Sequence, residues 1–222
     1  MLNRIITLDE VDSTNNYLKL NRGELPDGTL VTARIQTAGK GRRGHEWLAD
    51  QGMLPMSLLL KQPPHPDTLT LCAGVAVCEA LEPLLPGEEL GIKWPNDIIL
   101  HGHKLCGILC ESVCFGSSMD IVCGIGVNLA QTAEFFEKAN IPHGGSVEML
   151  TGVTINDRDK LAEDIAERLY SYSRSGFESV REKYVKRCLT VGKKIRIIEN
   201  GSEREAFAEG IAVSYTHLRA HE

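Results

Sequence analysis

Apolar residues recur at intervals of three and four between residues 67 and 85, which makes this stretch the clearest helix that the sequence predicts. The positions that carry the repeat are Leu69, Cys72, Ala73, Ala76, Val77, Ala80, Leu81 and Leu84. A proline-rich breaker at residues 63–66 precedes this helix, and Pro86-Gly87 ends it. Two further helices are predicted over residues 155–172 and 176–189, where apolar residues show the same spacing.

Short apolar runs separated by turns predict the strands of a sheet. The runs cover residues 5–8, 28–37, 53–60, 91–100, 104–111 and 120–129. Short turns at residues 101–103 and 116–118 join the later runs, and the run at residues 91–100 itself contains a sharp turn. Successive strands joined by short turns indicate an antiparallel or mixed sheet. The sequence therefore predicts an α+β fold in which helices flank a mixed, largely antiparallel sheet.

The end of the chain has a different pattern. Residues 194–198 alternate between polar and apolar side chains, Asn200-Gly201 is typical of a hairpin turn, and residues 206–213 resume a strand-like run. Residues 214–222 lack strand alternation, and we interpret them as a cloning or sequencing scar. We therefore expect a main domain over residues 1–189, a small and incomplete β domain over residues 190–213, and a non-native tail over residues 214–222.

Composition narrows the classes of protein to which the chain can belong. The formal net charge is −6 for 222 residues, which argues against a general nucleic-acid binder. No apolar run approaches the roughly 20 residues that span a bilayer, and residues 1–6 lack the features of a signal peptide. We therefore expect a cytoplasmic protein without a membrane partner. Cys106, Cys110 and Cys114 have even spacing, which predicts one face of a strand rather than a zinc site.

A cationic, glycine-rich loop stands out in this acidic chain. Residues 39–47 read Gly-Lys-Gly-Arg-Arg-Gly-His-Glu-Trp, so the three cations Lys40, Arg42 and Arg43 fall within four residues. Such a concentration of positive charge suggests that an anion binds there, although a solvated surface turn has a similar composition. The segment matches the G-x-G-x-x-G pattern of dinucleotide-binding proteins, but no helical pattern follows it. A cationic loop between two strands fits the sequence better.

Polar residues elsewhere in the chain allow both a structural and a functional interpretation. Ser13 and Thr14 are good N-cap residues for a helix that begins near residue 14, and the start of a helix can also bind a small polar ligand. Lys104 opens an apolar strand, which suits either a lysine at a strand end or a cation at the rim of a pocket. Residues 94–97 have the composition of a turn. Taken singly, each of these features favours the structural interpretation.

Five segments in a fixed order together resemble the biotin–protein ligases. They are Ser13-Thr14-Asn15, residues 36–44, residues 93–97, residues 104–109 and residues 124–128. The resemblance runs from about residue 5 to about residue 210. It implies a fold related to class II synthetases, with a small SH3-like barrel at the C-terminus. It also implies an ATP-dependent, AMP-forming ligase that converts biotin to biotinyl-5'-AMP and then transfers biotin to a lysine of a biotin carboxyl carrier protein.

The resemblance also implies roles for individual residues. The biotin site that it implies consists of Ser13, Thr14, Asn15, Gln36, Gly39, Lys40, Gly41, Arg42 and Lys104, with Gln36 bonded to the ureido group. The nucleotide contacts that it implies come from Lys40, Arg42, Arg43, Trp47 and Asn128. Two residues would be catalytic: Lys104 would bridge the biotin carboxylate and the α-phosphate, and Arg42 would close over the adenylate phosphate. ATP and biotin are the substrates, Mg²⁺ is expected to assist, and no metal ligands are assigned.

Some features depart from the pattern of the family. The loop carries Lys40 and His45 where the family commonly has arginine, and a lysine cannot form a bidentate contact with phosphate. No DNA-binding helix-turn-helix precedes residue 5, so we expect neither a DNA partner nor repressor activity. A lipoate–protein ligase, which shares the fold and the chemistry, and a non-catalytic biotin sensor are the two alternatives. A homodimer is compatible with the resemblance.

Overall fold

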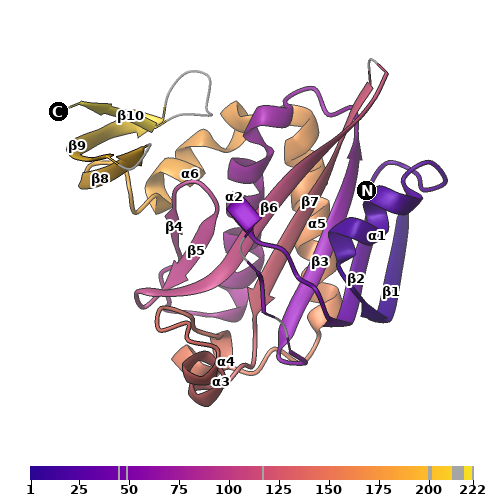
Figure 1. Cartoon of the computed structure of the whole chain (residues 1–222), viewed down its shortest axis with the longest axis horizontal. Helices are drawn as coiled ribbons and strands as arrows, with labels where there is room; N and C mark the ends of the chain where they lie inside the picture. Colours follow the sequence, from indigo (N-terminus) through magenta and orange to yellow (C-terminus); the bar gives the residue numbers. More distant parts are fainter. Residues whose placement is uncertain (45, 49, 117, 200–201, 212–217, 222) are drawn as a thin grey trace.

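The structure is a computed structural model that describes residues 1–44, 46–48, 50–116, 118–199, 202–211 and 218–221. The strands of its main sheet are β1 (Arg4–Val11), β2 (Thr29–Gln36), β3 (Met53–Lys61), β4 (Gly91–Lys93), β5 (Asp97–Leu100), β6 (His103–Phe115) and β7 (Ser118–Asn128). These seven strands lie in the order β1-β2-β3-β7-β6-β5-β4 (Figure 1). β1 and β2 pair in parallel, and all the other neighbouring pairs are antiparallel. The prediction of a mixed, largely antiparallel sheet is confirmed.

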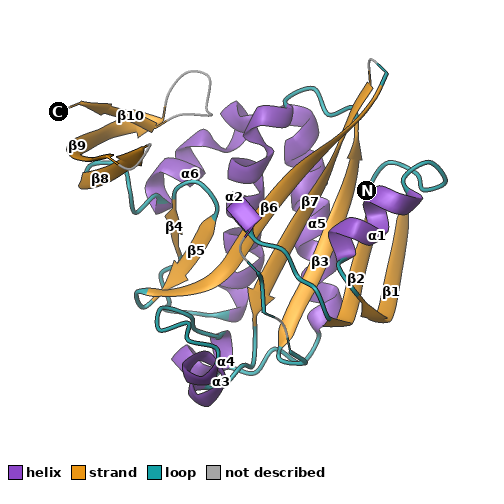
Figure 2. Ribbon diagram, in the orientation of Figure 1, coloured by secondary structure: helices purple, strands orange, loops and turns teal. Residues whose placement is uncertain are grey.

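Helices cover the two faces of this sheet unequally. They are α1 (Thr14–Asn21), α2 (Leu69–Leu81), α3 (Ala133–Lys138), α4 (Val147–Thr151), α5 (Arg158–Ser175) and α6 (Arg181–Arg187). α1 lies alone on one face, whereas α2 and α5 lie on the other (Figure 2). Eleven of the thirteen residues of α2 are buried, because α5 packs along this helix from outside while the sheet covers it from inside.

Two apolar clusters hold these layers together. The larger cluster lies between the sheet, α2 and α5, and it includes Leu58 and Leu60 of β3. The smaller cluster lies under α1 and includes Leu59 of the same strand. Successive side chains of a strand point to opposite faces, so β3 contributes to both clusters. Ser57 therefore shares the α1 face with Leu59, and this face carries the polar site described below.

Two predicted helices are shorter than the apolar pattern suggests. The helix expected over residues 67–85 is α2 flanked by the short 3₁₀ turns η2 (Pro66–Thr68) and η3 (Glu82–Leu84). Pro83, the second residue of η3, has no amide hydrogen with which to continue the α-helix. The helix expected over residues 176–189 is the 3₁₀ turn η4 (Phe177–Val180) followed by α6.

The apolar pattern does not predict α3 and α4. Each has at most six residues, which is too short for an apolar repeat to be recognised. Their start signals are visible only in retrospect. The side chain of Thr132 caps α3 by accepting a hydrogen bond from Phe135 N, and that of Ser146 caps α4 by accepting one from Met149 N. Both helices lie beyond the end of β7 (Figure 1).

Arg158, at the start of α5, joins two strands where their own pairing stops. The β2–β3 ladder ends at the pair Thr32 and Met56. Beyond it, the Arg158 guanidinium donates from Nη2 to Ala33 O at 3.1 Å and to Met53 O at 2.6 Å. Within β3, Met56 is preceded by Pro55, which has no amide hydrogen to offer a neighbouring strand. The two strands can therefore separate at this point, toward the site.

A second, three-stranded sheet follows α6. It consists of β8 (Lys194–Glu199), β9 (Ser202–Ile211) and β10 (Leu218–His221), all antiparallel. The prediction that residues 214–222 form no strand is wrong for Leu218–His221, which pair with β9. The predicted Asn200-Gly201 turn and the rest of that tail lie outside the described residues. Whether the domain boundaries follow residues 189 and 213, and whether the tail is native, stay predictions.

Other sequence features take ordinary places in this fold. Cys106 and Cys110 pack against the larger apolar cluster, as their even spacing predicts, whereas Cys114 is exposed. None of the helices in the described ranges combines the length and the apolar character needed to cross a membrane.

Candidate functional site

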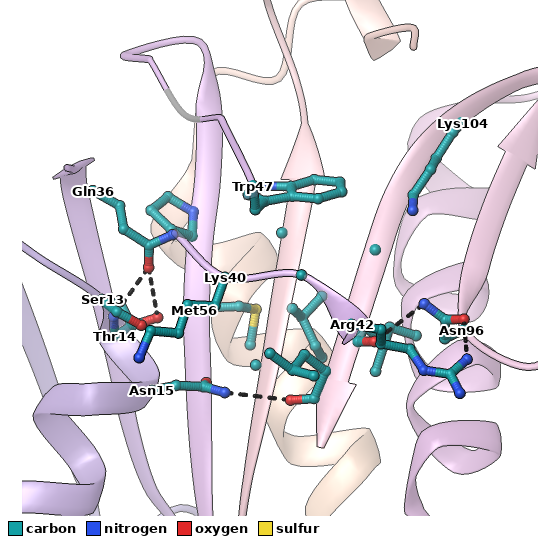
Figure 3. Close-up of a pocket in the computed structure, with 18 residues that line it drawn as sticks. Ser13, Thr14, Asn15, Gln36, Lys40, Arg42, Trp47, Met56, Asn96 and Lys104 are labelled. Atoms are coloured by element: carbon teal, nitrogen blue, oxygen red, sulfur yellow. Dashed lines mark hydrogen bonds between the residues drawn. The ribbon is translucent and has the colours of Figure 1, made fainter. Parts of the chain in front are cut away.

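A small cavity of about 60 Å³ opens on the α1 face of the sheet (Figure 3). Eight of the nine residues predicted to bind biotin line it: Ser13, Thr14, Asn15, Gln36, Lys40, Gly41, Arg42 and Lys104. The ninth, Gly39, lines a wider hollow on the outer side of the same loop. The residues come from α1, β2, the cationic loop and β6, so the fold assembles a site from segments that are distant in sequence.

The start of α1 forms one wall of this cavity. Ser13 is the N-cap, and its hydroxyl accepts a hydrogen bond from Asn16 N. The amide of Thr14, which has no partner within the helix because it belongs to the first turn, donates to Gln36 Oε1 at 3.0 Å. Ser13, Thr14 and Gln36 are all buried. The side chain of Gln36 therefore lies against the helix start, as Figure 3 shows.

A chain of hydrogen bonds runs from this wall to an ion pair. Ser57 Oγ lies 2.7 Å from Thr14 Oγ1 and 2.6 Å from Asn15 Oδ1. Asn15 Nδ2 donates to Glu111 Oε2 at 2.7 Å, and Lys19 Nζ donates to Glu111 Oε1 at 2.9 Å. Burial alone would raise the pKa of the Glu111 carboxyl, but the hydrogen bonds from Lys19 and Asn15 outweigh burial and lower this pKa. The carboxylate is therefore ionised.

Glycines form the floor of the cavity. Gly107 of β6 and Gly126 of β7 are register partners, and the Trp47 indole rests on both. A Cβ atom would lie 2.7 Å from the indole at Gly107 and 2.5 Å from it at Gly126. Only glycine therefore leaves room for this ring. Because the indole occupies the space above the floor, the cavity is much smaller than the roughly 300 Å³ at which ligand pockets begin.

The cationic loop closes back on itself beside the cavity. Trp47 N donates to Gly39 O at 2.9 Å, and a Cβ atom at Gly39 would lie only 2.3 Å from Trp47 O, so the close approach requires glycine. Lys40 Nζ donates to Asn16 Oδ1 at 3.3 Å. Arg42 begins the 3₁₀ turn η1 (Arg42–Gly44). His45, where the sequence departs from the family pattern, lies outside the described residues.

Two cations of the site are held by the turn between β4 and β5. Lys104 Nζ lies 2.7 Å from Asp97 Oδ1, and Arg42 Nη1 donates to Asn96 Oδ1 at 2.8 Å. Lys104 Nζ also lies 5.3 Å from the centre of the Trp47 ring, within range of a cation–π contact. The turn at residues 94–97 thus holds both cations on one side of the indole.

A larger cavity of about 570 Å³ adjoins the first. Both cavities are lined by Gly41, Arg42, Trp47, Asn96 and Lys104. Trp94, Phe135 and Phe136 line the larger one together with the charged side chains of Glu46 and Asp97. Arg42 and Lys104 therefore lie at the boundary between the small cavity with its polar wall and the larger cavity.

Asn128 lines the larger cavity but has little capacity for a ligand. Its Nδ2 donates to Lys104 O at 3.3 Å and to Gly145 O at 3.0 Å, and its Oδ1 accepts from Gln131 Nε2 at 3.2 Å. The side chain is only 5% exposed. Its bonds hold the backbone of Lys104 in place.

The sequence therefore identified most of the cavity lining but missed the residues behind it. Ser57 and Glu111 carried no motif, and their contacts with α1 span 42 and 96 positions in the sequence. The alternation of β3 could have indicated that Ser57 shares a face with Leu59, but not what it faces. Nothing is described of the side chain of Arg43, so its predicted nucleotide contact stays a prediction.

Comparison with known proteins identifies the family of the chain. Residues 8–128 match the model of the biotin/lipoate A/B protein ligase family. The chain is similar to the biotin–[acetyl-CoA-carboxylase] ligase of Paracoccus denitrificans, with 36% identity over 92% of this chain and 89% of that protein. It is also similar to the bifunctional ligase/repressor BirA of Salmonella typhimurium, with 31% identity over 93% of this chain.

The chain spans only 66% of the length of the Salmonella protein. Among solved structures, the biotin protein ligase from Aquifex aeolicus in complex with biotin and ATP superposes with a TM-score of 0.77. The identity is 28%, and the match covers 95% of this chain and 89% of the Aquifex chain. The mixed sheet with its flanking helices is thus the catalytic fold of the biotin ligases, and the small C-terminal sheet fits an SH3-like barrel.

Proposed function

The chain belongs to the biotin/lipoate A/B protein ligase family, and from this premise we propose that it is a biotin–protein ligase. It activates biotin with ATP to biotinyl-5'-AMP and transfers biotin to a lysine of a biotin carboxyl carrier protein. The observation that carries the proposal is the position of Lys104 and Arg42 at the boundary between the two cavities. A relative with 36% identity and a structural neighbour with biotin and ATP bound support the choice of substrates.

Charge explains why cations are needed at this boundary. In the first step a carboxylate oxygen of biotin attacks the α-phosphorus of ATP, a new phosphorus–oxygen bond forms, and the bond to pyrophosphate breaks. Two anions must approach each other, and more negative charge leaves with pyrophosphate. Fixed cations at the point of contact offset this repulsion. Lys104 bridges the carboxylate and the α-phosphate, and Arg42 closes over the phosphate.

The other predicted residues divide between the two cavities. Ser13, Thr14, Asn15 and Gln36 hold the biotin head group in the small polar cavity, with Gln36 on the ureido group and with Gly39 and Gly41 at the backbone of the loop. The nucleotide lies in the larger cavity, with Trp47 near the adenine. Lys40 and Arg43 belong to the cationic loop beside it and remain part of the proposed nucleotide contacts. Asn128 contributes by holding the Lys104 backbone. The Trp47 indole leaves the glycine floor when biotin enters, because the present cavity is too small.

The second step is an acyl transfer. The amine of the carrier lysine, having lost a proton, attacks the acyl carbon of the adenylate and forms an amide bond. AMP leaves with the bonding electrons, and the nitrogen releases its second proton to water. An acyl-adenylate reacts with water, so the cationic loop protects it until the carrier arrives.

A magnesium ion is part of the proposal, although the described residues contain no group of three or more acidic, histidine or cysteine side chains that could hold a metal. Asp97 is the acidic side chain nearest to Lys104. One carboxylate suits an ion that arrives with ATP and keeps phosphate oxygens and water as its other ligands. Magnesium then supplies charge neutralisation at the phosphates.

The remaining partners follow from the same premise. The biotin carboxyl carrier protein is the macromolecular substrate. Two copies of this chain can form a homodimer, and the expected compartment is the cytoplasm. DNA and membranes are not expected partners of this segment.

Incubation with ATP, Mg²⁺ and radiolabelled biotin or lipoate tests the proposal directly. We expect biotinyl-5'-AMP and an equal amount of pyrophosphate from biotin, and no adenylate from lipoate. Adenylate from lipoate alone would make the chain a lipoate–protein ligase. Tight binding of biotin without pyrophosphate release would make it a sensor. Either result would overturn the proposal.

A further inference from the structure

Ser57 belongs to none of the motifs, yet its hydroxyl lies at the centre of the polar wall. It is completely buried, and two oxygens, Thr14 Oγ1 and Asn15 Oδ1, lie within 2.7 Å of its Oγ. A hydroxyl has one hydrogen to donate. Ser57 can therefore donate to only one of these oxygens, and the other contact must be made by a hydrogen from the neighbour.

Glu111 decides which of the two bonds Ser57 donates. The carboxylate, paired with Lys19, can only accept, so the Asn15 atom that faces it at 2.7 Å must be the amide nitrogen. Asn15 Nδ2 also donates to Leu109 O at 3.4 Å. The amide is thereby fixed with Oδ1 toward Ser57. An amide oxygen cannot donate, so the Ser57 hydrogen goes to Asn15.

The hydrogen between Ser57 and Thr14 then belongs to Thr14. Because Thr14 donates to Ser57, it has no hydrogen left for Gln36, whose Oε1 lies 3.3 Å from Thr14 Oγ1. Gln36 Oε1 accepts instead from the Thr14 amide. Two oxygens that can only accept therefore lie side by side on the cavity wall, and a ligand N–H group can bond to this pair.

We propose that Ser57 and Glu111 are positioning residues that fix the direction of the hydrogen bonds in the polar wall of the small cavity. The wall thereby selects a ligand that places an N–H donor at Thr14. This inference rests on the proposed function and deepens it. A cyclic urea offers such a donor. A ring that has sulfur, carbon or an ether oxygen at that position offers none and leaves Thr14 Oγ1 buried without a donor, which is costly.

Replacing the carboxylate would remove the constraint. In Glu111→Gln the new amide can present its own NH₂ group to Asn15. Asn15 could then turn over and donate to Ser57, Ser57 would donate to Thr14, and the Thr14 hydrogen would face Gln36 or the ligand. The wall would offer a donor where it now offers only acceptors. In Ser57→Ala the Thr14 hydroxyl loses its acceptor, so its hydrogen can also face Gln36 or the ligand.

Direct binding measurements by calorimetry test the proposal. The probes are biotin and its two cyclic carbamate analogues, each with one ureido N–H replaced by an ether oxygen. The parent should bind one carbamate at least tenfold more weakly than biotin, because a single unpaired buried group costs about that much or more. In Ser57→Ala and Glu111→Gln the affinity for biotin should fall about tenfold, and the discrimination against that carbamate should largely disappear.

The KM for biotin should rise in parallel, while kcat and the KM for ATP stay within about twofold. Ser173→Ala is the matched control, because Ser173 is also a buried serine that donates to one oxygen, Tyr170 O, but lies on α5 away from the site. Glu111 is partly exposed, so Glu111→Gln tests the proposal even where Ser57→Ala does not fold.

Two results would overturn this inference without touching the proposed function. One is a parent that forms biotinyl-5'-AMP but binds biotin and both carbamates equally well. The other is a pair of variants that lose affinity for biotin and for the carbamate by the same factor, which would mean that Ser57 and Glu111 only support packing. A parent that forms no adenylate at all would instead contradict the proposed function.

Discussion

At the scale of single residues, the two cations of the site are each paired with a neighbour in the same turn. Lys104 contacts Asp97, and Arg42 donates to Asn96. These contacts orient both side chains toward the boundary between the cavities before any substrate arrives. They also set a cost for substrate binding, because each cation must exchange a protein partner for a carboxylate or phosphate oxygen. For Arg42 the exchange favours the ligand, since hydrogen bonds between two charged groups are stronger than those to the Asn96 amide. Lys104 already contacts a carboxylate, so it exchanges one anionic partner for another.

Arg42→Gly should separate formation of the adenylate from its retention. The substitution removes the charge that holds the loop on the adenylate phosphate but leaves Lys104 at the reacting atoms. We expect biotinyl-5'-AMP to form, to dissociate faster than from the parent, and to biotinylate exposed lysines of an added bystander protein. Stopped-flow release of the adenylate and biotin on the bystander are the two measurements.

Arg42→Lys serves as the control, because it keeps the charge and should retain the intermediate better than glycine does. Release of adenylate from Arg42→Gly at the parental rate would remove the retaining role from Arg42.

At the scale of elements, the strands were predicted well and the short helices poorly. Residues 53–60 and 120–129 are long apolar runs, so a buried strand can be predicted there from the local sequence alone. Both are strands close to the predicted bounds. α3 and α4 are short, and packing at the end of β7 stabilises them rather than a repeat of their own. The residues behind the cavity, such as Ser57, escaped prediction for a related reason: their partners are brought close only by the sheet.

Glu79 joins three helices and offers a test of packing on the far face of the sheet. This α2 residue contacts Tyr172 of α5 and lies 2.8 Å from Lys183 of α6 and 3.6 Å from Arg168 of α5. Burial would raise the pKa of the Glu79 carboxyl, but hydrogen bonds from Lys183 and Tyr172 lower it overall. Because charged hydrogen bonds contribute about 1.5–3 kcal/mol, Glu79→Gln should lower the free energy of unfolding at pH 7 by roughly that amount.

The same substitution has a predictable pH dependence. A carboxyl whose pKa is lowered in the folded state stabilises the fold above its unfolded pKa of about 4.3 and loses this effect as the pH falls through the folded pKa. The difference between Glu79→Gln and the parent should therefore shrink below about pH 4. Glu167→Gln, on the exposed side of α5, is the control and should change little. A difference that stays constant from pH 7 to pH 3 would contradict this account.

At the scale of the whole molecule, the site depends on contacts between segments at opposite ends of the main domain. α1 supplies the polar wall, β6 and β7 supply the glycine floor, and α5 reaches back through Arg158 to β2 and β3 beside the site. The resemblance of five short segments to one family predicted that they would meet. It could not predict that the Trp47 indole occupies the floor, because that depends on packing against Gly107 and Gly126.

The small C-terminal sheet offers a test that is independent of the site. β10 pairs with β9 from Leu218↔Ile211 to His221↔Phe207, so deletion of residues 214–222 should expose the edge of β9. We expect faster amide hydrogen exchange at Phe207 and Ile211, with adenylate formation unchanged, whereas the Ala208 amide donates to Lys193 O on the other side of β9 and should keep its protection. Unchanged exchange at these amides would mean that the tail does not cover the edge in solution.

The rate of adenylate formation in Lys104→Met tests the central claim most directly, measured in a single turnover with radiolabelled ATP and saturating biotin. Removal of one preorganised group that stabilises developing charge typically slows a reaction by about 10²–10³-fold. We expect a loss of this size in Lys104→Met at saturating biotin, with the melting temperature little changed. Lys186→Met, on the exposed side of α6, should react like the parent. Adenylate formation by Lys104→Met at the parental rate would contradict the claim that the boundary between the two cavities is where biotin and ATP react.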